Sequence, residues 1–95
     1  MNPKVGTFPR RNQTRYRIKD GRHRLVKSGL SAQRARELQD AASDALEGAT
    51  GAVHDYTISS ADNTYTLAGP RFTITATAEE LGSLVQQLDD VLEDR

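Results

Sequence analysis

The 95-residue chain contains no cysteine and no long apolar run. Without cysteine it can form neither a disulfide framework nor a thiolate metal site, which fits a reducing compartment. No stretch approaches the roughly 20 apolar residues of a membrane-spanning helix. The basic N-terminus also lacks the apolar segment that a secretory signal requires. We therefore expect a soluble, cytoplasmic protein with no membrane partner.

The sequence also lacks the motifs that usually carry catalysis. It has no glycine-rich phosphate loop, no metal-ligand triad and no nucleophile motif. His23 and His54 are far apart in the chain, and the Ser59-Ser60 pair has no companion base that the sequence can identify. We therefore expect a protein that is not an enzyme, with no cofactor, no metal ion and no small-molecule substrate.

The two signs of charge are separated along the chain. The net charge is zero because 13 Lys and Arg balance 13 Asp and Glu. Residues 1–36 hold eleven basic residues and one acidic residue, a charge of +10. Residues 37–95 hold two basic residues and twelve acidic residues, a charge of −10. Such a partition indicates interaction surfaces rather than a uniformly solvated globule.

A β-hairpin is predicted over residues 14–28, where polar and apolar residues alternate on both sides of Asp20-Gly21. Asp-Gly between alternating runs is the strongest short-range hairpin signal, because a type I′ turn needs positive φ at both central residues. The predicted pairs are Lys19 with Arg22, Ile18 with His23, Arg17 with Arg24 and Tyr16 with Leu25. The core face would carry Tyr16, Ile18, His23 and Leu25, and the opposite face Arg15, Arg17, Lys19, Arg22 and Arg24.

This predicted basic face favours an anionic partner, and DNA in particular. Like charges directly opposite each other destabilise a strand pair by about 0.2–1 kcal/mol, and the predicted register contains two such pairs. Arginine favours bidentate contact with phosphate, and a two-stranded ribbon is of a size that enters the DNA major groove. Together with a basic N-terminal arm over residues 1–12, the expected DNA contacts are Arg10, Arg11, Arg15, Arg17, Lys19, Arg22, Arg24 and Lys27.

Two helices and a meander are predicted in the rest of the chain. A helix capped by Ser31 and stopped by Gly48 completes a hairpin–helix half over residues 13–48. From Val53 onward, apolar residues recur at every second position. This spacing predicts three strands with threonine on the exposed side. The capping box Thr77–Glu80 then opens the second helix.

The expected fold is therefore α+β, in a single domain. Its antiparallel sheet is formed by two halves of the chain. The first is the β-hairpin–helix half, and the second, over residues 53–95, is a three-stranded meander followed by a helix. Each helix has one apolar stripe and each strand one apolar face, so both helices are expected to pack on the same face of the sheet.

One stretch resembles a known family: GTFPRRNQTRYRIKDGRHRLVKSGLSAQRARELQDA. It is similar to the arm-type (AP2-like) DNA-binding domain of phage-type tyrosine recombinases, over about residues 5–42. The shared features are a short strand (Val5–Phe8), an Arg-rich aromatic strand, Asp-Gly, a second basic strand, and a helix opened by serine. The resemblance implies a three-stranded sheet in the major groove with contacts from Arg15, Arg17, Arg22 and Arg24. No recombinase catalytic domain follows, and residues 53–95 have no counterpart in that family.

The function expected from this resemblance is that of a small DNA-binding accessory or regulatory protein of phage or mobile-element type. Two alternatives stay open. A protein-interaction module or inhibitor would bind its partner through the basic face or through the acidic second helix, with Gln86, Asp89, Asp90, Glu93 and Asp94. Head-to-tail pairing of basic and acidic halves would instead give a homodimer.

Double-stranded RNA is a further alternative partner. The order of elements from the first helix onward is that of double-stranded RNA-binding domains, and Gly69-Pro70 stands at their Gly-Pro turn. However, Glu79-Glu80 replaces the basic cluster with which that family contacts phosphates.

Overall fold

The computed structural model describes residues 1–93. The chain has the predicted α+β class, and its strands form two antiparallel sheets rather than one. The elements follow one another as β1 (Pro3–Arg10), β2 (Gln13–Asp20), β3 (Arg24–Leu30), α1 (Ala32–Leu46), β4 (Gly51–Val53), β5 (Tyr56–Ala61), β6 (Thr64–Ala68), β7 (Thr73–Thr77) and α2 (Ala78–Glu93). We call β1-β2-β3 the first sheet and β4-β5-β6-β7 the second sheet.

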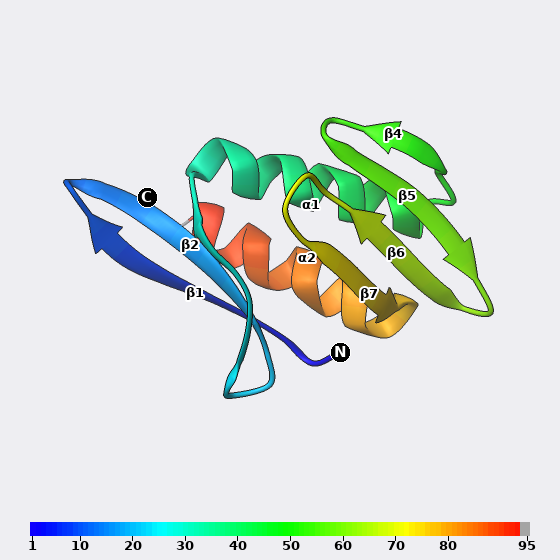
Figure 1. The fold of residues 1–95 in the computed structure, drawn as a ribbon, viewed down its shortest axis with the longest axis horizontal. Helices are drawn as coiled ribbons and strands as arrows, with labels where there is room; N and C mark the ends of the chain where they lie inside the picture. The colour runs from blue at the N-terminus through cyan, green and yellow to red at the C-terminus, as the bar shows by residue number, and fades with distance from the viewer. Residues whose placement is uncertain (94–95) are drawn as a thin grey trace.

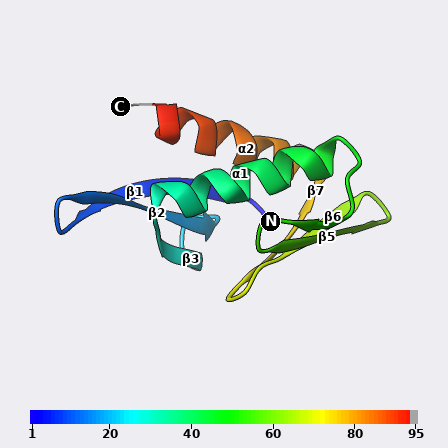
Figure 2. The same cartoon turned by 90° about the horizontal axis from the view of Figure 1, so that it is seen from above.

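Both helices lie on one side of the two sheets, as the sequence predicts. α1 and α2 run side by side as one layer, and the two sheets lie next to each other as the second layer (Figures 1 and 2). Among residues 1–93, no helix is long and apolar enough to cross a membrane.

One hydrophobic cluster joins both sheets to both helices. Tyr16 and Ile18 enter it from the first sheet, Leu67 and Ile74 from the second, and Leu88 from α2. Each large side chain that is fully buried stabilises the fold by about 1.5–3 kcal/mol. α1 contributes mainly small side chains to this cluster, namely Ala35, Leu38, Ala41, Ala42 and Ala45. Neither half of the chain therefore has a core of its own.

Both helices begin where their capping residues predict, and α1 ends just before Gly48, as expected. The Ser31 side chain accepts the Arg34 N–H at 3.2 Å, and Gly48 follows α1 with φ of 97°. At α2, Thr77 N–H donates to the Glu80 carboxylate at 2.9 Å, and Glu80 N–H donates to the Thr77 hydroxyl at 3.3 Å. These reciprocal bonds satisfy backbone donors that a helix start otherwise leaves without partners.

The second sheet contains the predicted meander and one additional strand. β5, β6 and β7 pair in order, with Ile58 opposite Leu67 and Leu67 opposite Ile74. β4 adds three residues at the free edge of β5. Its shortness explains why period-two patterning did not detect it, since three residues contain hardly more than one alternation.

The first sheet differs most from expectation, beginning with the predicted arm. Residues 3–10 form β1, which pairs with β2 from Pro3 opposite Asp20 to Arg10 opposite Gln13. The strand expected from Val5 to Phe8 lies within it, so most of the segment expected as a basic N-terminal arm over residues 1–12 is an edge strand of the first sheet. The β1–β2 connection is a two-residue turn in which Arg11 and Asn12 both have positive φ, 52° and 68°.

The predicted register of β2 with β3 is also wrong. Asp20-Gly21 opens a three-residue connection that brings Arg24 opposite Asp20 and Leu25 opposite Lys19. The pairing then shifts twice because β3 contains extra residues, among them Gly29 with φ of 77°, and Leu30 lies opposite Tyr16. The Lys19–Arg22 and Arg17–Arg24 pairs do not form, and the residues expected in the core, His23 and Leu25, are exposed.

Candidate nucleic-acid interface

The side of the first sheet that faces away from the helices is strongly basic. Tyr16 and Ile18 are fully buried toward the helices, so alternate residues of β1 and β2 point the opposite way. We call this side the outer face; it consists of Lys4, Gly6, Phe8, Arg10, Gln13, Arg15, Arg17, Lys19 and, from β3, Leu25. It contains five cations and no acid.

Arg17 is held in place on this face by two neighbours. It lies opposite Gly6, where an added Cβ would come within 3.3 Å of the Arg17 Nε and 3.6 Å of its Cγ. Its guanidinium carbon is 5.7 Å from the centroid of the Phe8 ring, within cation–π range. The side chain therefore lies across the glycine and over the aromatic ring.

Arg15 is half-buried beside this pair and only partly bonded within the chain. Its Nη2 donates to the Gln13 side-chain oxygen at 3.1 Å. Its Nε is the one shielded side-chain nitrogen or oxygen in residues 1–93 that has no hydrogen-bond partner. An unmade bond of this kind costs free energy, so the position of Arg15 is not explained by stability alone.

The outer face contains a like-charge pair that the sequence prediction missed. Lys4 lies directly opposite Lys19, an arrangement that destabilises a strand pair by roughly 0.2–1 kcal/mol. Extending the expected Val5–Phe8 strand by one residue would have found Lys4, because alternation places it on the same side as Phe8. A repulsion between like charges that favours a bound anion is therefore present, but it is between Lys4 and Lys19 rather than between the predicted pairs.

The remaining predicted contact residues are distributed around this face. Arg11 and Arg22 are exposed in the two connections at opposite ends of the sheet. Arg24 lies opposite Asp20 and so belongs to the helix side of the sheet, while Lys27 approaches the Phe72 ring at 6.0 Å in a cleft. Placing Arg24 on the basic face was therefore wrong, because it depended on the wrong register, and Lys27, an expected DNA contact, lies away from the outer face.

The cations of the outer face are not neutralised within residues 1–93. The ion pairs found there join the N-terminal ammonium to Glu80, Arg34 to Glu37 and Asp55, and His54 to Asp40. None of them includes an outer-face residue. The charge of this face is consequently available to a partner.

The acidic face of α2 is only partly free. Asp89 accepts a hydrogen bond from Gln39 of α1 at 3.3 Å, so it does not belong to an open contact stripe. Gln86 is exposed and bonds to Asp90 at 3.3 Å, and Glu93 is exposed; Asp94 lies outside the described residues. The acidic stripe is therefore smaller than predicted.

Gln87 joins α2 to β1. Its amide oxygen accepts the Val5 N–H at 2.9 Å, and its amide nitrogen donates to the Pro3 carbonyl at 2.7 Å. These bonds pair backbone groups on the edge of β1 that no strand covers. The outer face is thus fixed in orientation relative to the helix layer.

Comparisons of the chain with protein-family models, with curated proteins and with solved structures found no match. Within residues 1–93, no group of three His, Cys, Asp or Glu side chains is placed to hold a metal ion. The geometry of the outer face is therefore the basis for a functional assignment.

Proposed function

We propose that this chain is a small, non-enzymatic DNA-binding protein of accessory or regulatory type, and that its outer face lies against duplex DNA. The proposal rests on the five cations of that face. The face carries no acidic residue, and none of its cations forms an ion pair within residues 1–93. Phosphate contacts from such a surface supply most of the affinity of proteins for DNA.

The shape of the first sheet also supports this role. The tip of the β1–β2 hairpin extends past the ends of both helices (Figure 2), and residues 9–14 are all exposed. Arg10 and Arg11 lie at this tip. A two-stranded ribbon fits the major groove, and Arg17, stacked on Phe8, presents a planar fork that matches phosphate or a guanine edge.

The resemblance to the arm-type domain adds a third argument. That family places a three-stranded sheet in the major groove, and here a three-stranded sheet precedes α1 with its helix-free side basic. The competing proposal, a protein partner at the acidic face of α2, has less support because Asp89 is bonded to α1.

A salt titration of DNA binding tests the proposal. With about five phosphates engaged, log K should fall against log salt with a slope near −4.5, from roughly −0.9 for each phosphate. The double variant Arg17→Gln/Lys19→Gln should reduce the slope by about 2 units and still fold, because both side chains are outside the core. Arg36→Gln, which removes an exposed cation on α1, is the matched control and should bind as the wild type does. Absence of duplex binding at about 50 mM salt would refute the proposal.

A further inference from the structure

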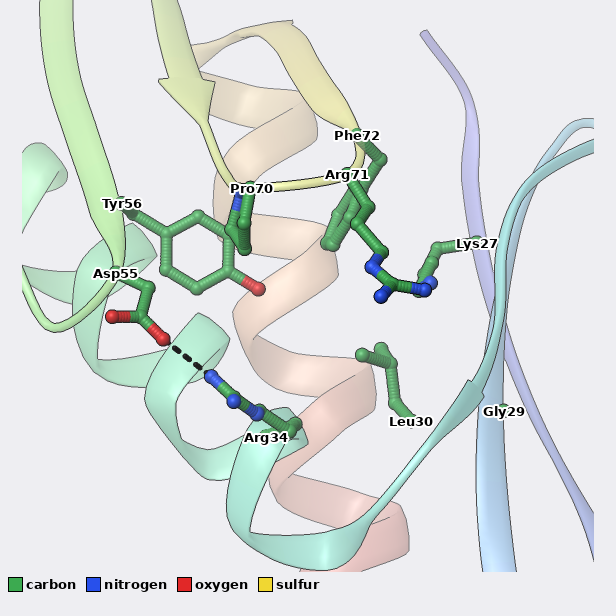
Figure 3. Close-up of a pocket in the computed structure, with 9 residues that line it drawn as sticks. All are labelled: Lys27, Gly29, Leu30, Arg34, Asp55, Tyr56, Pro70, Arg71 and Phe72. Carbon is green, nitrogen blue, oxygen red and sulfur yellow. Dashed lines mark hydrogen bonds and ion pairs between the residues drawn. The ribbon is translucent and has the colours of Figure 1, made fainter.

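A cleft of about 280 Å³ lies between the two sheets, on residues that the DNA proposal does not use. It is formed by the second half of β3, the start of α1, the start of β5 and the β6–β7 connection (Figure 3). Its principal side chains are Lys27, Leu30, Arg34, Tyr56, Arg71 and Phe72. Residues far apart in the sequence thus converge on one small space.

The charge of the cleft is not balanced by the chain. Asp55 forms an ion pair with Arg34, and this is the acid that lines the cleft. Lys27 and Arg71 extend toward each other from opposite walls (Figure 3), and neither has an ion-pair partner within residues 1–93. Two positive charges therefore remain uncompensated at close range.

Tyr56 supplies a hydrogen-bond donor to the same cleft. Its side chain is buried, and its hydroxyl points into the cleft without a hydrogen-bond partner among residues 1–93 (Figure 3). Burial raises the pKa of Tyr56 to about 12, so the hydroxyl keeps its proton at neutral pH. The group is therefore a donor aimed at the same space as Lys27 and Arg71.

The orientation of this tyrosine is set by its surroundings. A Cβ at Gly69 would lie only 2.7 Å from Cε1 of the Tyr56 ring, so the ring occupies space that only glycine leaves open. On another side, Phe72 meets the Tyr56 ring edge-to-face, with centroids 5.9 Å apart and an interplanar angle of 79°. The hydroxyl is thereby held in one position before any ligand arrives.

The cleft also has apolar walls. Leu30 is buried in the core, and the Phe72 ring and Pro70 line the same space. A cleft that combines a few convergent donors with apolar walls has the composition of a small-molecule site. Its volume lies near the lower end of such sites, so the group that enters it is small.

We propose that this cleft binds a small phosphate monoester that carries an aromatic or other planar group. Such a monoester has a charge of about −1.5 to −2 at pH 7, which matches the two unpaired cations, whereas a carboxylate would leave one of them uncompensated. The phosphate oxygens accept from Lys27, Arg71 and Tyr56. The planar group lies against Phe72 and Leu30.

Phenyl phosphate is the probe that tests this inference, with inorganic phosphate and phenol as its separate parts. Titrations followed by amide NMR should place the shifted signals around the cleft, with phenyl phosphate at least about tenfold tighter than either part. Adenosine 5′-monophosphate and O-phosphotyrosine then distinguish two sources of such a group. Tighter binding of one of them than of phenyl phosphate identifies the class of natural ligand.

Variants distinguish binding in the cleft from unspecific attraction of anions to the protein surface. Arg71→Gln should weaken phenyl phosphate binding about tenfold or more, since it removes a charge-assisted bond. Tyr56→Phe should weaken it about two- to tenfold, while the ring contacts that hold the fold remain. Arg36→Gln removes a cation of the same type outside the cleft and should change nothing. Equal affinity for phenyl phosphate and inorganic phosphate, or unchanged binding by Arg71→Gln, would overturn the inference.

Discussion

Among single residues, Arg17 depends most clearly on its immediate neighbours. Gly6 leaves room for its side chain, and Phe8 lies beneath its guanidinium. An exposed cation–π contact stabilises by only about 0.5–1 kcal/mol, so its main effect is on position. A guanidinium group that is already held in position loses less side-chain entropy when it binds phosphate.

Gly6→Ala should separate this positioning from stability. The new Cβ would press on the flexible end of Arg17, which can move away, while alanine reduces the entropy of the unfolded chain. We expect the free energy of unfolding to stay within about 1 kcal/mol of wild type and DNA affinity to fall about three- to tenfold, as the Arg17 contact weakens. Urea denaturation and a DNA titration on the same samples measure the two effects.

Gly82→Ala provides the control for that experiment. Gly82 lies in α2 with open space around its Cα, so alanine should add about 0.5–1 kcal/mol of stability. DNA affinity should not change. If Gly6→Ala binds DNA as tightly as Gly82→Ala does, the position of Arg17 has no part in binding.

Among the secondary-structure elements, the start of α2 is sensitive to pH through Glu80. Its carboxylate accepts the Thr77 N–H and pairs with the N-terminal ammonium at 3.0 Å. The bond from Thr77, followed by the one from the ammonium, lowers the pKa of Glu80. A carboxylate whose pKa is lower in the folded state contributes stability at neutral pH, and loses it as pH falls below about 4.3 toward the folded pKa.

Glu80→Gln should therefore lower the thermal midpoint at pH 7 and lower it less at pH 3, because the wild-type carboxyl loses its stabilising charge as the pH falls toward its lowered pKa. Melting curves at the two pH values measure the difference. Glu79→Gln is the matched control, because Glu79 is exposed and has no hydrogen bond or ion pair within residues 1–93. If both variants lower the midpoint equally at pH 7, the effect comes from the helix dipole rather than from the capping box.

The elements also differ in how well their sequences specify them. Both helices could be predicted because Ser31 and the Thr77–Glu80 box act within one helical turn. The register of β2 with β3 could not, because it depends on extra residues in β3 whose presence no local pattern indicates. The two-residue turn at Arg11-Asn12 contains no glycine, although both residues have positive φ. The Asp20-Gly21 signal therefore located the β2–β3 connection but gave it the wrong length and register.

The candidate interface was predictable only in part for the same reason. Arg15, Arg17 and Lys19 share one side of β2, and alternation within a single strand is enough to place them together. Lys4 and Phe8 required the pairing of β1, while Arg24 and Lys27 required the register of β3. The cleft could not be predicted at all, because its walls come from both halves of the chain.

For the whole molecule, the decisive feature is that the two halves share their core. Gln87 of α2 bonds to the edge of β1, and α1 buries a face of four alanines and Leu38 in the common hydrophobic cluster. Alanine side chains contribute little apolar area. The basic half therefore depends on large side chains such as Leu84 and Leu88 from the acidic half.

A fragment of residues 1–48 should accordingly be unfolded, although it contains the first sheet and α1. It would expose the alanine face of α1 and leave the Val5 N–H without its partner Gln87. We expect little amide dispersion in its NMR spectrum, and a single cooperative unfolding transition for the full chain. Mixing the fragment with residues 49–95 should restore dispersion. A fragment that folds alone and binds DNA would mean that the basic half is an independent module. The expected result means that the acidic half is the scaffold that holds the outer face in shape.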